Sequence, residues 1–285
     1  MRTYFDCYPC FLRQALSAAR RVGASDHQQQ IVLQRVLALL KSIQPGQTPP
    51  EIGYRVHQIV RDTVDSQDPY REAKDRSTIE ALRLYPKLKQ MVTKSDDPLD
   101  LALRISIAGN MIDFGPREHI DDLAAEIHLA IDQPIYSDHW EILRARLNEA
   151  DHLLFLADNA GETVFDRILI ETLSLPVIYA VKGGPILNDA TAEDAFAAGL
   201  HEIATLITTG SDAPGTILSF CSSEFKTIFH EAPIIIAKGQ ANYETLSEVG
   251  ENVFCLLQVK CPIIARDIGA PVGNLIVCQS TLTVN

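Results

Sequence analysis

The chain has 285 residues, of which 46% are hydrophobic and 22% are charged, and its formal net charge is −12. This composition excludes a minimal disulfide-stabilised fold and a globally disordered chain. The acidic balance disfavours partners such as nucleic acid or an anionic membrane, although single lysines could still hold one phosphate. No apolar run approaches the roughly 18 residues of a membrane-spanning helix. The first ten residues also lack the apolar stretch of a signal peptide, so we expect a cytoplasmic protein.

Residues 4–150 show the periodicity of α-helices. Apolar residues recur at three- and four-residue steps between Phe11 and Ala19, and Gly23 is expected to end this first helix. Ser25 and Gln28 predict a capping box ahead of the second helix. Further helices are expected to begin near residues 49, 68, 97, 118 and 137. The sequence therefore predicts an all-α region over residues 1–150.

The pattern changes after residue 150 to short apolar runs, each bounded by Gly, Asn or Asp and followed by a helical segment. The runs are His152–Ala157, Val177–Val181, Glu202–Thr208, Pro233–Ala237, Val253–Val259 and Leu275–Cys278. Strands of a parallel sheet are buried on both faces and read as continuous apolar runs, and their connections are helices. We therefore expect a doubly wound, mostly parallel α/β sheet of the Rossmann-like three-layer type over residues 151–285, with the helical region packed on it.

Polar residues follow five of these runs where the strands end. In chain order they are Asp158, Asn159 and Glu162; Lys182 and Asp189; Gly210–Thr216; Lys238 and Asn242; and Lys260. Ligands of open parallel sheets bind in the crevice beyond the carboxyl ends of the strands. Carboxylate and amide oxygens suit Mg²⁺ or Mn²⁺, whereas ammonium groups and backbone amides suit a phosphate. Residues 151–285 are therefore expected to bind metal and phosphate and to carry out metal-assisted phosphoryl chemistry.

Each of these signals also has an ordinary structural explanation. An Asp-Asn pair after a strand is often a turn or a helix cap, and a Lys-Gly pair is commonly a solvated turn. Their recurrence at successive strand ends is what favours a site. The sequence lacks the phosphate-binding P-loop, a Gly-x-Gly-x-x-Gly turn after the first strand and a Gly-x-Ser-x-Gly elbow. These absences disfavour a P-loop NTPase, a dinucleotide-binding enzyme and a serine hydrolase.

An ordered set of motifs resembles the DUF89 family of metal-dependent damage-control phosphatases, which includes the ARMT1-like proteins. The motifs in the second half are Asp158–Glu162 with Asp166, Leu187–Thr191 and Lys238–Glu244. Those in the first half, which resemble the stand-alone prokaryote-type branch, are Cys7-x-x-Cys10, Asp68–Tyr70 with Lys74, and Ala108–Asn110 with Asp113. The matching segments run from about residue 4 to residue 278, in the family's order.

The resemblance implies a hydrolase that releases phosphate from a small phosphorylated metabolite, such as a sugar phosphate or a cofactor-related phosphomonoester. It implies a divalent metal, Mn²⁺, Ni²⁺, Co²⁺ or Mg²⁺, held by Asp158, Asn159 and Asp189. It also implies a phosphate-binding lysine at Lys238, with Asn110 facing the same cavity.

A mechanism compatible with this assignment uses further residues of the strand ends. Lys182 and the loop that contains Gly210 and Ser211 are expected to contact the phosphate, as are Asp212 and Asn242. Glu162 and Asp212 are both candidates for the general base that accepts a proton from water. The residue patterns do not rank these two carboxylates, and they do not decide between attack on phosphorus by water and by a carboxylate.

The Cys7-x-x-Cys10 motif has three interpretations. The two thiols could be buried structural residues, a redox pair, or part of an auxiliary metal site that Cys261 completes. One such pair is a weak zinc signal, because a closed zinc site needs four ligands.

Two other functions stay open at this point. An S-adenosylmethionine-dependent carboxyl methyltransferase, an activity also attributed to the ARMT1-like group, is disfavoured by the lone Gly161 where such enzymes need a glycine-rich turn. A non-catalytic phosphometabolite-binding protein would keep the lysines but tolerate the loss of Asp158 and Asp189. The oligomeric state is open.

Overall fold

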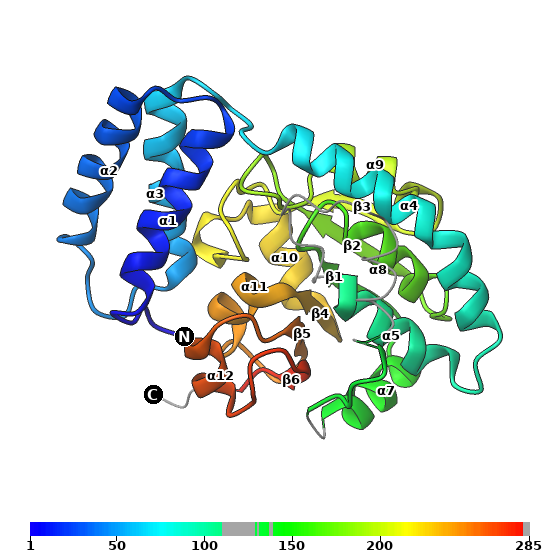
Figure 1. The fold of residues 1–285 in the computed structure, drawn as a ribbon. Coiled ribbons are helices and arrows are strands. Elements are labelled where there is room, and N and C mark those ends of the chain that lie inside the picture. Colours follow the sequence, from blue (N-terminus) through cyan, green and yellow to red (C-terminus); the bar gives the residue numbers. More distant parts are fainter. Residues whose placement is uncertain (110–128, 130, 137–138, 282–285) are drawn as a thin grey trace.

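The structure is a computed structural model that describes residues 1–109, 129, 131–136 and 139–281. Its first three helices form a bundle of their own beside the rest of the molecule (Figure 1): α1 (Cys7–Arg21), α2 (Asp26–Leu40) and α3 (Pro49–Val64). The expected capping box begins α2, because Ser25 Oγ accepts a hydrogen bond from the backbone N–H of Gln28 at 3.3 Å. Buried side chains such as Ala15, Val36 and Val56 form a separate hydrophobic core inside the bundle.

The remaining helices of the first half pack against the sheet. They are α4 (Arg71–Thr93), α5 (Pro98–Ala108) and α7 (His139–Glu149). Leu103 of α5 and Leu143 of α7 belong to the same hydrophobic core as Phe155 of the first strand. The predicted domain boundary at residue 150 stays a prediction, but the buried core continues across it. The helix expected near residues 118–131 lies almost wholly outside the described residues.

The second half forms a six-stranded sheet in the order β3-β2-β1-β4-β5-β6. The strands are β1 (Leu153–Leu156), β2 (Val177–Val181), β3 (Thr205–Thr208), β4 (Ile235–Lys238), β5 (Val253–Gln258) and β6 (Leu275–Gln279). The first five pair in parallel, and β6 pairs antiparallel to β5. Each expected apolar run overlaps one strand, although β4 and β6 each extend one residue beyond the run. The run that began at Glu202 is strand only from Thr205, after a short 3-10 helix, η2 (Leu200–Glu202).

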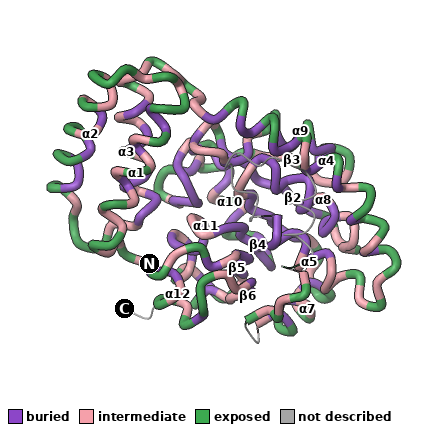
Figure 2. The backbone as a smooth tube through the Cα atoms, viewed as in Figure 1, coloured by how far each residue is buried: buried purple, intermediate pink, exposed green. Residues whose placement is uncertain are grey.

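Helices cover both faces of this sheet. Side chains along a strand point alternately to opposite faces, and accordingly Leu153 and Phe155 lie in one core whereas Leu154 and Leu156 lie in the other. The first face carries α4, α5 and α7 with α8 (Thr163–Ile170) and α9 (Ala192–Ala197); the second carries α10 (Ser223–Glu231), α11 (Gly239–Leu246) and α12 (Pro262–Ile268). A further short 3-10 helix is η3 (Leu218–Phe220). Strands β1, β4 and β5 are almost wholly buried (Figure 2), whereas the edge strand β3 has no fully buried residue. The predicted three-layer, mostly parallel α/β fold is confirmed.

Two expectations about the whole chain concerned membrane-spanning helices and disulfides. Within the described ranges, no helix combines the length and the apolar character needed to cross a membrane. All six cysteines are free thiols, as expected for a chain that does not depend on disulfides.

Candidate active site

The candidate site lies where the sheet reverses its order. From β1 the chain builds β2 and β3 on one side, and then crosses to build β4 and β5 on the other. The loops that follow β1 and β4 therefore separate, which leaves a crevice at the carboxyl ends of these two strands. Asp158 and Asn159 follow β1, and Lys238 is the last residue of β4. The fold thus brings the first and the fourth polar strand ends together.

The carboxylate of Asp158 packs against the first residue of α11. Gly239 has a φ of +79°, and a Cβ at this position would lie 1.9 Å from Asp158 Oδ2. Only glycine offers both the backbone conformation and the space. The carboxylate consequently lies at the amino end of a helix, where the exposed backbone N–H groups favour negative charge.

The loop after β2 joins the loop after β1 through its backbone. Asn159 and Asp189 form an isolated antiparallel bridge, and the N–H of Ala190 donates to the carbonyl oxygen of Asp158 at 2.8 Å. Asn188 Nδ2 donates to Asn159 Oδ1 at 2.6 Å. The structure therefore brings together Asp158, Asn159 and Asp189, the residues expected to hold a metal.

Lys238 is fully buried and its ammonium group is fully engaged. Its Nζ donates to Glu162 Oε1 at 2.6 Å, to Asp166 Oδ1 at 2.5 Å and to the carbonyl oxygen of Ser106 at 3.0 Å. An ammonium group has three hydrogens, so a phosphate would have to displace one of these partners. The phosphate-binding role of Lys238 stays a prediction, and what the structure adds is a close ion pair with Glu162.

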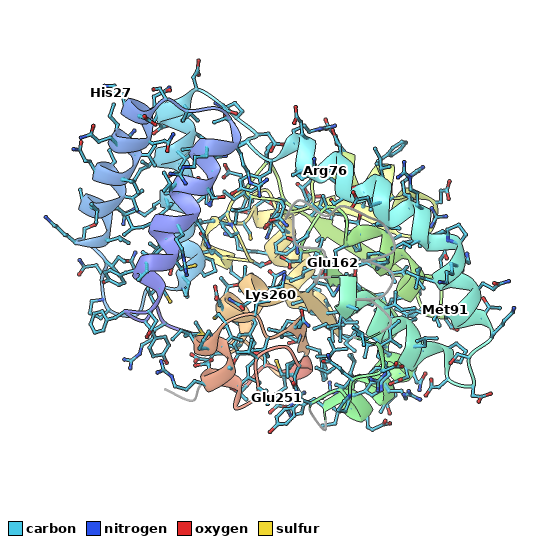
Figure 3. The ribbon with its side chains drawn as sticks, viewed as in Figure 1. His27, Arg76, Met91, Glu162, Glu251 and Lys260 are labelled. Carbon is cyan, nitrogen blue, oxygen red and sulfur yellow. The ribbon has the colours of Figure 1, made fainter. Side chains whose placement is uncertain are left out.

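Glu162 connects Lys238 to the other residues of the site. Its Oε2 accepts a hydrogen bond from Asn159 Nδ2 at 3.0 Å, and the same amide nitrogen donates to Asp158 Oδ2 at 2.9 Å. Figure 3 labels Glu162, which lies near the middle of the molecule, and also Lys260. Lys260 is exposed. Its positive charge lowers the pKa of Asp158, but burial and the neighbouring carboxylates raise that pKa by more.

Asp166 is a member of this cluster that reasoning from the sequence did not assign to the site. It is fully buried on α8, and it accepts hydrogen bonds from Ser106 Oγ at 2.7 Å and Tyr179 Oη at 2.8 Å besides its contact with Lys238. The signal in the sequence was a carboxylate on the apolar face of a short helix. Such a residue is expected to be buried, and a buried carboxylate needs a partner.

Lys182, after β2, faces Asp189 and the loop after β3. Its buried ammonium group donates to the carbonyl oxygen of Gly215 and lies 3.5 Å from Asp189 Oδ2. That carboxylate oxygen is buried and accepts no hydrogen bond from any residue that the structure describes. Asp189 therefore retains an acceptor that a cation could use.

The other expected phosphate contacts serve different roles in the structure. Asn242 Nδ2 donates to the carbonyl oxygens of Ala157 and Lys238, and Asn242 Oδ1 accepts from Thr216 Oγ1. Its amide hydrogens are thus committed to holding the strand ends together.

Asp212 forms an ion pair with Arg61 of α3 at 2.9 Å. Arg61 also donates to the carbonyl oxygen of Pro185, so it connects the helical bundle to two loops of the site. Sequence reasoning missed Arg61, because 151 residues separate it from Asp212 along the chain.

Gly210 and Ser211 lie in the loop after β3, next to Gly183 in the loop after β2. The carbonyl oxygen of Ser211 accepts a hydrogen bond from the N–H of Gly183 at 2.8 Å, and Ser211 Oγ accepts one from the N–H of Ala213 at 3.2 Å. Their predicted contact with phosphate stays a prediction. Asn110 lies outside the described residues.

The carboxyl groups of Asp158 and Asp189 have raised pKa values. Burial, followed by the neighbouring charges of Glu162 and Asp189, raises the pKa of Asp158 to about 8. Burial also raises the pKa of Asp189 to about 6, although the ammonium group of Lys182 opposes the change. Perturbed pKa values of this kind are typical of functional sites. Burial is the largest cause at both positions, and the neighbouring carboxylates add to it.

The donor set fits a divalent cation. Among the described residues of the site, the carboxylates of Asp158, Glu162, Asp166 and Asp189 outnumber the ammonium groups of Lys182 and Lys238. No three His, Cys, Asp or Glu residues in the described ranges are grouped closely enough to hold a metal by themselves. A metal here would therefore be held by the two aspartates together with the amide oxygen of Asn159, a hard-oxygen set that suits Mg²⁺ or Mn²⁺.

Cys7, Cys10 and Cys261 meet in a different place. All three line a cavity of about 440 Å³ between the α1–α3 bundle and the start of α12. Burial raises the pKa of the Cys7 thiol, with the neighbouring charge of Glu244 acting in the same direction. A raised pKa disfavours the thiolate that metal ligation and thiol–disulfide exchange require. The three interpretations of the motif stay open, and burial favours the structural one.

Comparisons with known proteins identify relatives over nearly the whole chain. The family model of the damage-control phosphatase ARMT1-like domain matches residues 3–276. The chain is 34% identical to an uncharacterized protein of Methanocaldococcus jannaschii, over 94% of this chain and 92% of the relative. It is 33% identical to a damage-control phosphatase of Pyrococcus horikoshii, over 97% of both chains. The solved structure of a DUF89 family protein from Pyrococcus horikoshii superposes with a TM-score of 0.91 at 32% identity, covering 99% of this chain and 100% of that one.

Proposed function

The chain belongs to the damage-control phosphatase ARMT1-like family, and from this membership we propose that it hydrolyses a small phosphorylated metabolite with the help of a divalent metal ion. The observation that carries the proposal is the convergence of Asp158, Asn159 and Asp189 at the strand ends, with an excess of carboxylates around them. Mn²⁺, Ni²⁺, Co²⁺ and Mg²⁺ are the candidate ions.

The metal would be held by Asp158, Asp189 and the amide oxygen of Asn159. When bound, it supplies positive charge that polarises a phosphoryl oxygen and lowers the pKa of water. The buried Oδ2 of Asp189, which accepts no hydrogen bond within the described part of the chain, supports this assignment. The Gly239 position supports it as well, because it leaves room for the Asp158 carboxylate at the amino end of α11.

Glu162 is the better of the two candidates for the general base. Lys238 and Asn159 each hold a different oxygen of this carboxylate, so its orientation toward Asp158 is set before a substrate binds. Asp212 is instead committed to Arg61 of α3. We therefore propose that Glu162 accepts the proton of the attacking water, and that Lys238 acts mainly by positioning Glu162.

Lys182 is the ammonium group best placed to contact the phosphate. It lies 3.5 Å from the buried Oδ2 of Asp189, and it donates to the carbonyl oxygen of Gly215. A phosphoryl group beside Asp189 would come within reach of this charge. Positive charge fixed where negative charge develops in the transition state stabilises it without reorganisation.

Neither alternative function gains support. Gly161 packs closely on α4, since a Cβ there would lie 2.8 Å from Ser77 Oγ, so its small size is explained by helix packing and not by a cofactor turn. A binding protein without catalysis would not need Glu162 oriented beside the two aspartates. We retain a cytoplasmic enzyme that acts on a small molecule, without a nucleic-acid or membrane partner, as part of the proposal.

The test is a screen for inorganic phosphate released from a panel of phosphorylated metabolites. Each compound is incubated with Mn²⁺, Ni²⁺, Co²⁺ or Mg²⁺, and with EDTA as the control. We expect release with at least one metal and none with EDTA. Equal release with and without EDTA would reject the role of the metal, and no release from any compound would reject the phosphatase itself.

A further inference from the structure

The cavity of about 440 Å³ that the cysteines line also continues the candidate active site. Leu187 lines it and directly precedes Asn188, whose amide holds Asn159. Gln240 lines it and directly follows Gly239, on which the Asp158 carboxylate packs. The loop that presents Asp189 and the start of α11, on which Asp158 packs, therefore also form part of the wall of the cavity.

A third loop of the site contributes in the same way. Pro214 lines the cavity and directly precedes Gly215, whose carbonyl oxygen accepts a hydrogen bond from Lys182. On the opposite side, Gly53 of α3 lies close to Pro214, since a Cβ at Gly53 would lie 3.9 Å from the proline ring. The cavity is thus lined by residues of α1 and α3 on one side and by residues of the strand-end loops on the other.

Leu187 adopts a backbone conformation that leucine rarely uses. Its φ is +46°, in the left-handed region, and its side chain packs against the core of the α1–α3 bundle. Such conformations cost free energy and concentrate at functional sites. Here the conformation lets one short loop turn Asp189 toward the carboxylates while Leu187 covers the cavity.

The wall of the cavity is mostly apolar. Phe11, Pro49, Pro50, Leu187, Pro262 and Ile263 are among the residues that form it. Within the described residues, the positive groups of the wall are Arg13 and the amino terminus of Met1, and they equal the acidic Asp6 and Glu244 in number. An apolar pocket of this size is typical of small-molecule sites, and without an excess of positive charge it does not favour a ligand that carries a second phosphate.

Gln240 provides a hydrogen-bond acceptor inside this wall. Its Nε2 donates to Glu244 Oε1 at 3.0 Å and lies 3.7 Å from Cys261 Sγ, which fixes the orientation of the amide. Its Oε1 is buried and accepts no hydrogen bond from the described part of the chain. Because a buried acceptor without a donor is costly, a donor on a bound ligand would satisfy it.

We propose that this cavity binds the leaving group of the substrate, which is a phosphomonoester of an alcohol with an apolar or aromatic body, a hydrogen-bond donor that meets Gln240, and no second phosphate. This inference rests on the proposed phosphatase function and narrows its substrate class. It also explains why the three thiols lie so near the strand ends: they form part of the wall that surrounds the leaving group.

A kinetic test compares phosphate esters of primary alcohols, so that the chemical step is similar. The probes are benzyl phosphate, 3-hydroxybenzyl phosphate, glucose 6-phosphate and fructose 1,6-bisphosphate. We expect 3-hydroxybenzyl phosphate to have the highest kcat/KM, about 5- to 10-fold above benzyl phosphate, which is the worth of one neutral hydrogen bond. Gln240→Met should remove this ratio by raising KM, whereas Gln30→Met, on the exposed side of α2, should preserve it. A preference for either sugar phosphate, or a ratio that survives Gln240→Met, would overturn the proposal.

A second readout does not depend on turnover. In metal-free protein, 3-hydroxybenzyl phosphate should slow the alkylation of Cys7, Cys10 and Cys261 by iodoacetamide several-fold, as measured by mass spectrometry. Cys278 is also partly exposed but does not line the cavity, so it serves as the internal reference. Protection without hydrolysis would reject the phosphatase and leave the cavity as a ligand site. Hydrolysis without protection, or equal protection of Cys278, would reject the cavity as the leaving-group site.

Discussion

Two groups of buried charges in this molecule differ in how they are balanced. Between α4 and α9, Lys74 pairs with Asp194 at 2.8 Å, and the more exposed Asp68 lies 3.7 Å away. At the ends of β1 and β2, by contrast, carboxylates outnumber the lysines among them: Lys238 is shared by Glu162 and Asp166, and Lys182 forms an ion pair with Asp189 at 3.5 Å.

This difference separates a structural ion pair from a binding site. A buried pair that is matched and hydrogen-bonded needs nothing further, and Asp194 in addition accepts hydrogen bonds from the N–H and hydroxyl groups of Thr191 at the start of α9. Where buried carboxylates outnumber the ammonium groups, burial can keep their pKa values raised, as it does for Asp158 and Asp189. Such groups gain from a cation that binds between them.

The largest expected effect is on activity. Asp158→Asn and Asp189→Asn should each lower kcat/KM for metal-dependent phosphate release by at least about 1,000-fold, because losing a direct ligand should exceed the 10–100-fold typical of residues that only support a ligand. The matched control is Asp151→Asn, an exposed aspartate just before β1, which should retain normal activity. If Asp158→Asn retained normal activity, the catalytic site would have to lie elsewhere in the molecule.

The second effect is on the free energy of unfolding, through the buried ion pair of Lys74 and Asp194. Lys74→Met leaves Asp194 buried without its cation, and breaking a buried pair in this way costs about 3 kcal/mol or more of the free energy of unfolding. Lys87→Met, on the exposed side of the same helix, should change stability by less than about 0.5 kcal/mol. Urea denaturation measures both. The loss should be the same with and without metal, and a loss that metal reverses would show that Lys74 belongs to the site.

The third effect is a pH dependence of the metal-free protein. Because the pKa of Asp158 is raised to about 8 in the folded state from its ordinary value near 3.8, the folded protein binds more protons than the unfolded chain between these values. Stability therefore falls as pH rises from 4 to 8. In EDTA at pH 9, Asp158→Asn should be more stable than the natural protein by about 1–2 kcal/mol, and at pH 4 the difference should vanish. Unfolding curves that keep the same separation at both pH values would contradict the assigned charge excess.

The sheet could be predicted from the sequence because most of its strands are buried on both faces. Each apolar run overlaps a strand, and the run Val177–Val181 coincides with β2. The grouping of Asp158 with Asp189 could be expected too, since parallel strands bring their carboxyl ends to one edge. The antiparallel direction of β6 left no signal in its composition.

What could not be predicted depends on contacts between distant segments. The burial of Lys238 depends on Asp166 and Ser106, which approach from α8 and α5. The ion pair of Arg61 with Asp212 requires the bundle to sit against the strand-end loops. Nothing in the motif around Lys238 distinguishes a lysine that faces a phosphate from one that holds a glutamate.

The most direct test is a calorimetric titration of the metal-free protein with Mn²⁺. We expect one strong site per chain, protons released on binding, and an affinity that rises between pH 6 and pH 8, because a metal must displace the protons of carboxyl groups with raised pKa values. Asp158→Asn should abolish the strong site, and Asp151→Asn should keep it. Strong binding that survives in Asp158→Asn, or no binding by the natural protein, would contradict the account.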